Sequence, residues 1–387
     1  MKKISIWRQS VLLYTPVNAG RRRLHKREDF MDEFINQPVF LLCVVATVVT
    51  LLFFFSLPSV GSPTNERILI EMVDGVLMLR AAHFPAYSAG VLYGLSVFTR
   101  IRARRCPDGK VRVLMLKQHL KRLKETAHHC FPNKKDVVLA HAVGWEKQLF
   151  AAVREYFKRG GDPNWCYIHI EIGPTSGGGA MLRAAQAQLQ TYIAVSAELP
   201  LYGNGLVLSP EREFFRPKGV LTPWKVKGLY AELFQLKQRA RSRLAAAGVV
   251  LKVGTDVETV LFNQEGHVVE LGCANLVLVD ESNKTLFMSA EHHRFSGLTE
   301  WLVVQYVVLG LLGSGWKVKK VPITEDMLRT LPAASLGTAG GIVRILSYDG
   351  ETLPESSVIP RLQELHSQAW NGEVWSNVFL SSVIPEC

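Results

Sequence analysis

Residues 224–230 read WKVKGLY, and residues 268–275 read VVELGCAN. The first stretch places Lys225 five residues before Tyr230, and the second places Glu270 five residues before Asn275. Together the two stretches supply an amine, a phenol and a carboxylate. Each group is weak evidence alone, because a lysine ahead of a tyrosine is more often a solvated residue beside a core aromatic.

These three groups are the ones that pyridoxal phosphate chemistry needs. A lysine amine forms a Schiff base with the cofactor, a phenol can hydrogen-bond the ring hydroxyl, and a carboxylate can keep the pyridine nitrogen protonated. A protonated ring is an electron sink, which makes an α-carbanion of the substrate accessible. The pair of stretches therefore indicates pyridoxal 5'-phosphate as the cofactor.

Four further motifs accompany these stretches in a fixed order. Upstream lie LYGLSVFTRIRA at residues 92–103 and KQHLKRLKETA at residues 117–127, and downstream lie FSGLTE at residues 295–300 and SLGTAGGI at residues 335–342. In this order the motifs resemble those of the class IV aminotransferases. That group holds branched-chain aminotransferases, D-amino-acid aminotransferases and aminodeoxychorismate lyases. The resemblance runs from about residue 68 to about residue 350.

The resemblance implies an α+β (mixed α/β) architecture of PLP fold type IV, in which two domains enclose the cofactor in the cleft between them. The pattern of the chain agrees, because predicted helices and strands mix without the strict βαβ rhythm of a doubly wound sheet. We expect a basic leader at 1–37, a transmembrane or targeting helix at 38–58, a small N-terminal α/β domain at 66–197, an interdomain linker at 198–220, and a larger cofactor-binding domain at 221–387.

The resemblance also assigns the groups that bind the cofactor. Lys225 is implied as the catalytic Schiff-base lysine, which the family's lysine-to-tyrosine spacing favours over the neighbouring Lys227. The other implied cofactor-binding residues are Tyr230 at the ring oxygen, Glu270 at the ring nitrogen, and Arg122, Leu298, Thr299 and Thr338 at the phosphate. Turns that open helices suit the last three positions, since they present backbone and hydroxyl donors to an anion.

The substrate set implied by the resemblance departs from the family pattern. It comprises Tyr93, Phe98, Arg100, Tyr167, His169, Thr338 and Ala339. Arg100 stands where the family commonly has glycine, and His169 stands where branched-chain enzymes often have arginine. Both side chains can present positive charge, so we expect acidic or polar amino acids to be preferred over leucine, isoleucine or valine. Alternatively, Arg100 turns to solvent or pairs within the protein.

These roles together predict a transaminase that acts on an amino acid and a 2-oxo acid, with Lys225 moving the α-proton. Two alternatives stay open. One is an enzyme like aminodeoxychorismate lyase, and the other is a degenerate, membrane-tethered relative without catalysis. The family also implies a homodimer.

Residues 39–57, VFLLCVVATVVTLLFFFSL, form an uncharged apolar run that is long enough to cross a membrane as a helix. Basic residues precede the run, which by the positive-inside rule predicts a single-pass membrane protein with a cytosolic N-terminus. The first 27 residues carry eight Lys or Arg and no acid. This leader therefore also suits mitochondrial targeting, and a start codon assigned too far upstream is a third reading.

Composition excludes several other classes. The net charge of +11 is divided between the leader and helical positions, and no nucleic-acid-binding motif accompanies it, so we expect no nucleic-acid partner. The six cysteines form no CxxC pair, and no ligand set stands at metal spacing, so we expect no metal. The GTAGG turn lacks the GxGxxG pattern of a nicotinamide site.

Overall fold

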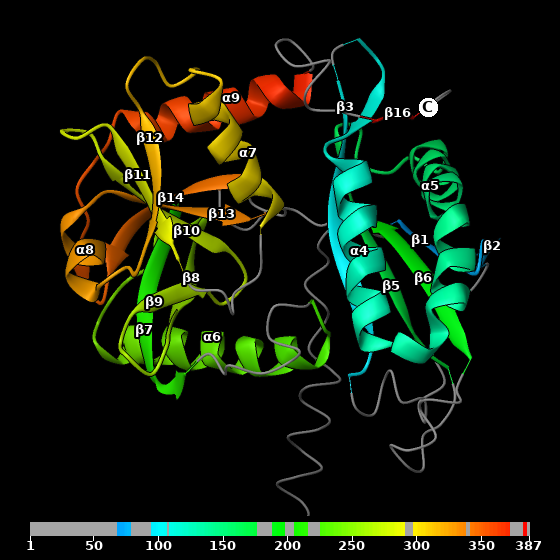
Figure 1. The fold of residues 1–387 in the computed structure, drawn as a ribbon, viewed down its shortest axis with the longest axis horizontal. Coiled ribbons are helices and arrows are strands. Elements are labelled where there is room, and N and C mark those ends of the chain that lie inside the picture. The colour runs from blue at the N-terminus through cyan, green and yellow to red at the C-terminus, as the bar shows by residue number, and fades with distance from the viewer. Residues whose placement is uncertain are drawn as a thin grey trace, which may run out of the picture. The chain divides into compact units, whose positions relative to one another are not determined.

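A computed structural model describes residues 68–78, 94–106, 108–175, 188–197, 205–215, 225–290, 297–337, 341–371 and 382–384 (Figure 1). Contacts divide the chain into two units, Met1–Glu66 and Arg67–Cys387, and all described residues belong to the second. The predicted leader and the apolar run at 39–57 lie outside the described residues. Within the described ranges, no helix combines the length and hydropathy of a membrane span.

The N-terminal half builds a seven-stranded sheet in the order β16-β4-β3-β5-β6-β1-β2. Every neighbouring pair in it is antiparallel. The strands are β1 (Leu69–Val73), β2 (Val76–Leu77), β3 (Val97–Arg105), β4 (Val111–Val113), β5 (Trp165–Pro174), β6 (Leu189–Ser196) and β16 (Ser382–Ile384). The short strand β16 comes from the end of the chain, so the last residues return to the first sheet.

Helices α4 (Leu116–Cys130) and α5 (Lys135–Lys158) cover one face of this sheet (Figure 1), joined by the 3-10 turn η1 (Pro132–Lys134). Their apolar side chains form one core with the sheet, in which Trp145, Leu149 and Tyr156 are almost completely buried. Strand residues alternate between two faces. Val97 and Ile101 enter this core, so Phe98 and Arg100 belong to the face that the helices do not cover.

The C-terminal half builds a nine-stranded mixed sheet in the order β12-β11-β10-β13-β14-β7-β8-β9, with β15 paired to β14. The pairs β11–β12, β14–β7 and β7–β8 are parallel, and the other pairs are antiparallel. The strands are β7 (Gly205–Phe215), β8 (Thr255–Phe262), β9 (Val268–Leu271), β10 (Asn275–Asp280), β11 (Thr285–Ser289), β12 (Lys317–Val321), β13 (Ala333–Gly337), β14 (Gly341–Tyr348) and β15 (Glu351–Thr352).

Four helices pack on this second sheet: α6 (Gly228–Ala246), α7 (Leu298–Val308), α8 (Glu325–Thr330) and α9 (Val358–Asn371). The side chains of β10 show which helices pack on each side of the sheet. Val277 and Val279 pack with α7 and α9, whereas Leu276 and Leu278 pack with the inner faces of β7, β8 and β9 and with Leu328 of α8. Two sheets with helices packed on them confirm the predicted mixed α+β architecture.

One predicted boundary is wrong in part. The sequence assigns 198–220 to a linker, but residues 205–215 form the long strand β7 inside the second sheet. Strand β7 contains Pro210, although proline cannot donate to a strand ladder. Strand β7 tolerates it because its pairing with β14 covers only Leu206 to Leu208, and beyond that point one edge of β7 is no longer paired to β14.

Candidate active site

The lysine segment ahead of α6 is bound to strand β3 of the first sheet. The amide of Phe98 donates to the carbonyl of Lys225 (3.2 Å), and the amide of Lys227 donates to the carbonyl of Ser96 (2.8 Å). These bonds make an antiparallel bridge between Val97 and Val226. The backbone of Lys225 is therefore fixed along the edge of β3.

Two glycines permit this close approach. Gly94 has a φ of +60°, and a Cβ at that position would lie 2.5 Å from the Cα of Gly228. The amide of Gly228 donates to the carbonyl of Gly94 (3.1 Å). A side chain at residue 94 would therefore push the two segments apart.

The amine of Lys225 faces two adjacent aromatic rings. Its Nζ is 5.1 Å from the ring centroid of Phe98 and 5.8 Å from that of Tyr230, and the two rings meet edge to face at 4.9 Å. Burial, followed by the charges of Arg122 and Arg100, lowers the pKa of Lys225 to about 7. A large share of Lys225 is therefore the neutral, nucleophilic amine near neutral pH.

Arg122 projects from α4 toward this amine. Its Nη2 donates to the Thr99 hydroxyl (3.2 Å), which shares a 2.9 Å hydrogen bond with Nδ1 of His119. Burial and the charges of Arg122 and Lys225 hold the pKa of His119 well below 6.5. A neutral imidazole thus supports Thr99 without adding a further positive charge near Lys225.

Glu270 lies on β9 opposite Leu261 of β8 and is almost completely buried. Its negative charge acts to raise the pKa of Lys225, which places the two side chains within electrostatic reach of each other. The charge of Tyr230 likewise acts on the pKa of Arg122, after the larger effect of burial. The structure thus brings together Lys225, Tyr230, Glu270 and Arg122, which the sequence predicts as cofactor-binding residues.

Leu298 and Thr299 begin helix α7, and Thr299 is buried. Gly297 precedes them in an extended conformation, and a Cβ there would lie 1.9 Å from Oδ1 of Asn275. This helix start therefore needs glycine, and its first amides suit an anion. Three other predicted site residues, Tyr93, Thr338 and Ala339, lie outside the described residues.

The predicted substrate residues Phe98, Arg100, Tyr167 and His169 share the uncovered face of the first sheet. Arg100 is exposed and stands directly opposite His169 in the ladder between β3 and β5. Tyr167 is buried opposite Arg102, whose guanidinium carbon lies 5.4 Å from its ring centroid. The ring of His169 stacks on Phe98 at 5.2 Å, so the imidazole lies next to the aromatic wall of Lys225.

The structure adds a carboxylate that the motifs did not single out. Glu171 is buried on the same face of β5 and accepts bonds from Nζ of Lys227 (3.1 Å to each oxygen) and from Nε2 of His169 (3.0 Å). The sequence signal was available, because Glu171 follows Tyr167 and His169 at a spacing of two. Lys227, the alternative Schiff-base lysine, is thus an ion-pair partner of β5.

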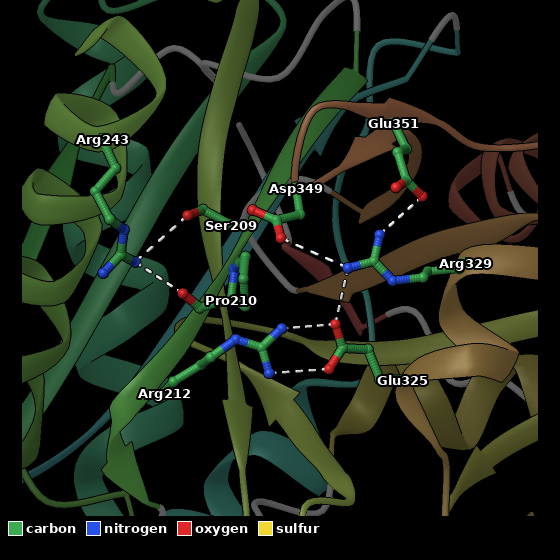
Figure 2. A network of polar contacts seen from close by, with 8 residues as sticks. All are labelled: Ser209, Pro210, Arg212, Arg243, Glu325, Arg329, Asp349 and Glu351. Atoms are coloured by element: carbon green, nitrogen blue, oxygen red, sulfur yellow. Dashed lines mark hydrogen bonds and ion pairs between the residues drawn. The ribbon is translucent and has the colours of Figure 1, made fainter. Parts of the chain in front are cut away.

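A second polar cluster lies on the C-terminal sheet and holds none of the predicted site residues (Figure 2). Arg212 of β7 pairs with both oxygens of Glu325 at 3.0 and 2.7 Å, and Arg329 joins Glu325 to Glu351. The hydrogen bond from Arg212 is the main cause that lowers the pKa of Glu325 to about 2. A cavity of about 380 Å³ adjoins Arg212. The charged groups of the cluster are paired with one another, which indicates that the cluster anchors α8.

Within the described residues, no group of three or more histidine, cysteine or acidic side chains is arranged to hold a metal ion.

The chain was compared with known protein families and structures. A sequence profile described as Amino-transferase class IV matches residues 96–348, and no curated protein matches the chain. The similar solved structures include branched-chain aminotransferases. The one from Thermoproteus uzoniensis, solved with norvaline, has a TM-score of 0.66 and 20% identity over 81% of this chain and 99% of that chain.

The second, from Escherichia coli, has a TM-score of 0.66 and 20% identity over 82% of this chain and 99% of that chain. A third structure is an aminotransferase from Brucella abortus bound to the co-factor PLP. It has a TM-score of 0.60 and 16% identity, covering 78% of this chain and 98% of that chain. These likenesses show a shared fold. Because the profile covers well over half of the sequence, the chain belongs to the class IV aminotransferase family.

Proposed function

We propose that this chain is a pyridoxal 5'-phosphate-dependent aminotransferase that exchanges an amino group between an amino acid and a 2-oxo acid. The observation that carries the proposal is the environment of Lys225. Its amine has a pKa of about 7, faces the adjacent rings of Phe98 and Tyr230, and is within electrostatic reach of Glu270 and Arg122. A structural lysine gains nothing from such surroundings, whereas a nucleophilic one requires a neutral amine.

The donor set fits pyridoxal 5'-phosphate. Lys225 would hold the cofactor aldehyde through Nζ, Tyr230 the ring hydroxyl, and Glu270 the ring nitrogen. The phosphate would be held by Arg122, the N-terminus of α7 at Leu298 and Thr299, and Thr338. When bound, the cofactor supplies an electron sink for the substrate α-carbon. Lys225 then serves as the base that moves the α-proton, since its pKa lies near working pH.

Other parts of the proposal come from the sequence and the family alone. Membrane attachment through residues 39–57, mitochondrial targeting by the leader and homodimer formation stay predictions. The substrate amino acid is also unassigned by the fold. The lyase and the non-catalytic relative are not favoured, because the matching solved structures described above are aminotransferases.

The proposal is tested by a half-reaction on the full chain, purified in detergent with the cofactor. We expect an absorbance in the near-visible region that decays when the correct amino acid is added and returns when a 2-oxo acid follows. The Lys225→Ala variant should lose this exchange, because the nucleophile and base are removed together. Absence of any cofactor absorbance, or a full panel of amino acids without decay, would contradict the proposal.

A further inference from the structure

Lys227, Glu171 and His169 form a connected group that neither the fold nor the family match explains. The carboxylate of Glu171 is only 3% exposed, and it receives both the Lys227 ammonium and the His169 imidazole. Burial alone would raise the pKa of Glu171, but the bond from His169 and the charge of Lys227 help to lower it to about 2. Glu171 is therefore a carboxylate throughout the neutral range.

This group adjoins the reactive lysine. Glu171 stands directly opposite Phe98 in the ladder between β3 and β5, and the Phe98 ring contacts both His169 and the amine of Lys225. Lys227 follows Lys225 by two residues on the segment that is bound to β3. The group therefore lies next to the Lys225 amine, on the face that also holds the predicted substrate residues Phe98 and Arg100.

A second carboxylate adds to the negative charge of Glu171 on this face. Glu71 on β1 is buried on this face and accepts a hydrogen bond from the hydroxyl of Tyr192, whose ring lies 6.4 Å from that of His169. Burial, followed by the hydrogen bond to Glu71 and the charges of Glu71 and Glu171, raises the pKa of Tyr192. The face therefore carries two buried carboxylates beside its cationic groups.

We propose that Glu171 is a specificity-determining residue that directs the enzyme away from acidic side chains. Its carboxylate binds Lys227 and His169 from within the protein, where the carboxylate of a substrate side chain would otherwise bind. A second carboxylate brought to the same nitrogens would meet the charge of Glu171 at close range. The inference rests on the proposed transaminase function, and it reverses the preference expected from His169 in the sequence.

The test compares substrates in the Glu171→Gln variant of the full-length, cofactor-loaded protein. Glutamine keeps the shape of the side chain and removes its charge, so the two nitrogens lose their internal counter-ion. We expect the ratio of kcat/KM for glutamate to kcat/KM for leucine to rise about tenfold relative to the unmodified protein. As a readout without catalysis, glutarate should bind the cofactor-free variant more tightly than the cofactor-free unmodified protein.

Two further variants keep the inference falsifiable. Lys227→Met removes a positive charge that balances Glu171, so the ratio of kcat/KM for glutamate to kcat/KM for leucine should fall. This measurement tests the role of Glu171 even where Glu171→Gln does not fold. Glu71→Gln removes the other buried carboxylate without touching Lys227 or His169, and it should change the ratio much less than Glu171→Gln.

An unchanged ratio in Glu171→Gln, an equal rise in Glu71→Gln, or an unchanged ratio in Lys227→Met would overturn the specificity role of Glu171. These results differ from a failure of the proposed function, in which the unmodified protein transaminates no amino acid at all.

Discussion

At the scale of the residue, Lys225 combines features that a stable core would avoid. Its amine is taken out of water and set near two guanidinium groups, and both effects favour the neutral form. A base whose pKa is depressed on folding weakens the folded state at any pH where the unfolded chain binds the proton. The stability cost of Lys225 is therefore complete below about pH 7, and it fades as the pH rises toward the ordinary pKa of 10.5.

The titration of Lys225 can be measured directly. In the cofactor-free protein, the rate of acetylation at Lys225 should rise with pH and level off with a midpoint near 7, because only the neutral amine reacts. Peptide mass spectrometry of pulse-labelled samples gives this profile. Arg122→Met should raise the midpoint, because it removes a neighbouring positive charge. As a control, Arg239→Met on the exposed side of α6 should leave the midpoint unchanged. A midpoint near 10 in the unmodified protein would show that the amine is solvated.

Glu270 offers a prediction on the chemical step. Glu270→Gln should still bind the cofactor, since a neutral amide keeps the shape of the site. It should slow removal of the α-proton by roughly 30- to 150-fold, because losing one charge-assisted contact costs about 2–3 kcal/mol. Single-turnover kinetics with a saturating amino acid isolate this step. Equal rates in the variant and the unmodified protein would refute the role of Glu270.

At the scale of the element, the site depends on a segment between the two sheets rather than on a regular helix or strand. Residues 225–228 follow the edge of β3 through backbone bonds and then enter α6 at Gly228. The position of this segment rests on these backbone bonds and on the close approach of Gly94 to Gly228. Changes at that contact should reach Lys225.

Gly94→Ala tests this contact against a matched control. Gly94 and Gly109 both have positive φ, at +60° and +76°, but nothing lies within 4 Å of a Cβ at Gly109. Gly109→Ala should therefore cost only about 1 kcal/mol of unfolding free energy, from the backbone conformation. Gly94→Ala should cost roughly 2 kcal/mol more and should shift the acetylation midpoint of Lys225 upward. Equal losses in urea unfolding of the two variants would rule out a steric role for Gly94.

The elements also show where sequence reasoning succeeds. Helical periodicity over residues 137–159, followed by Gly160 and Gly161, predicts a helix that ends before the two glycines. The structure has α5 there, at Lys135–Lys158. Strand β7 was missed because its pairing partners, β8 and β14, lie about 50 and 140 residues further along the chain, and only folding brings them together. The alternation of Tyr167, His169 and Glu171 places Glu171 on the substrate face, but its ion pair with Lys227 was not predictable, because only the folded chain brings the two together.

At the scale of the whole molecule, the described residues form two sheets whose side chains converge on Lys225. The first sheet provides Phe98 and the group around Glu171, and the second provides Glu270 next to the lysine segment. The resemblance to the class IV aminotransferases implied this convergence. The chemistry of the substrate side was not predictable in the same way, because it depends on ion pairs across strands.

The central claim is that Lys225 holds the cofactor, and borohydride reduction tests it most directly. The full-length protein is incubated with pyridoxal 5'-phosphate, reduced, digested and mapped by mass spectrometry. We predict one pyridoxyl group, fixed on the peptide that contains Lys225, and its loss in Lys225→Ala. A label on Lys227 or Lys237, or no label at all, would contradict the account.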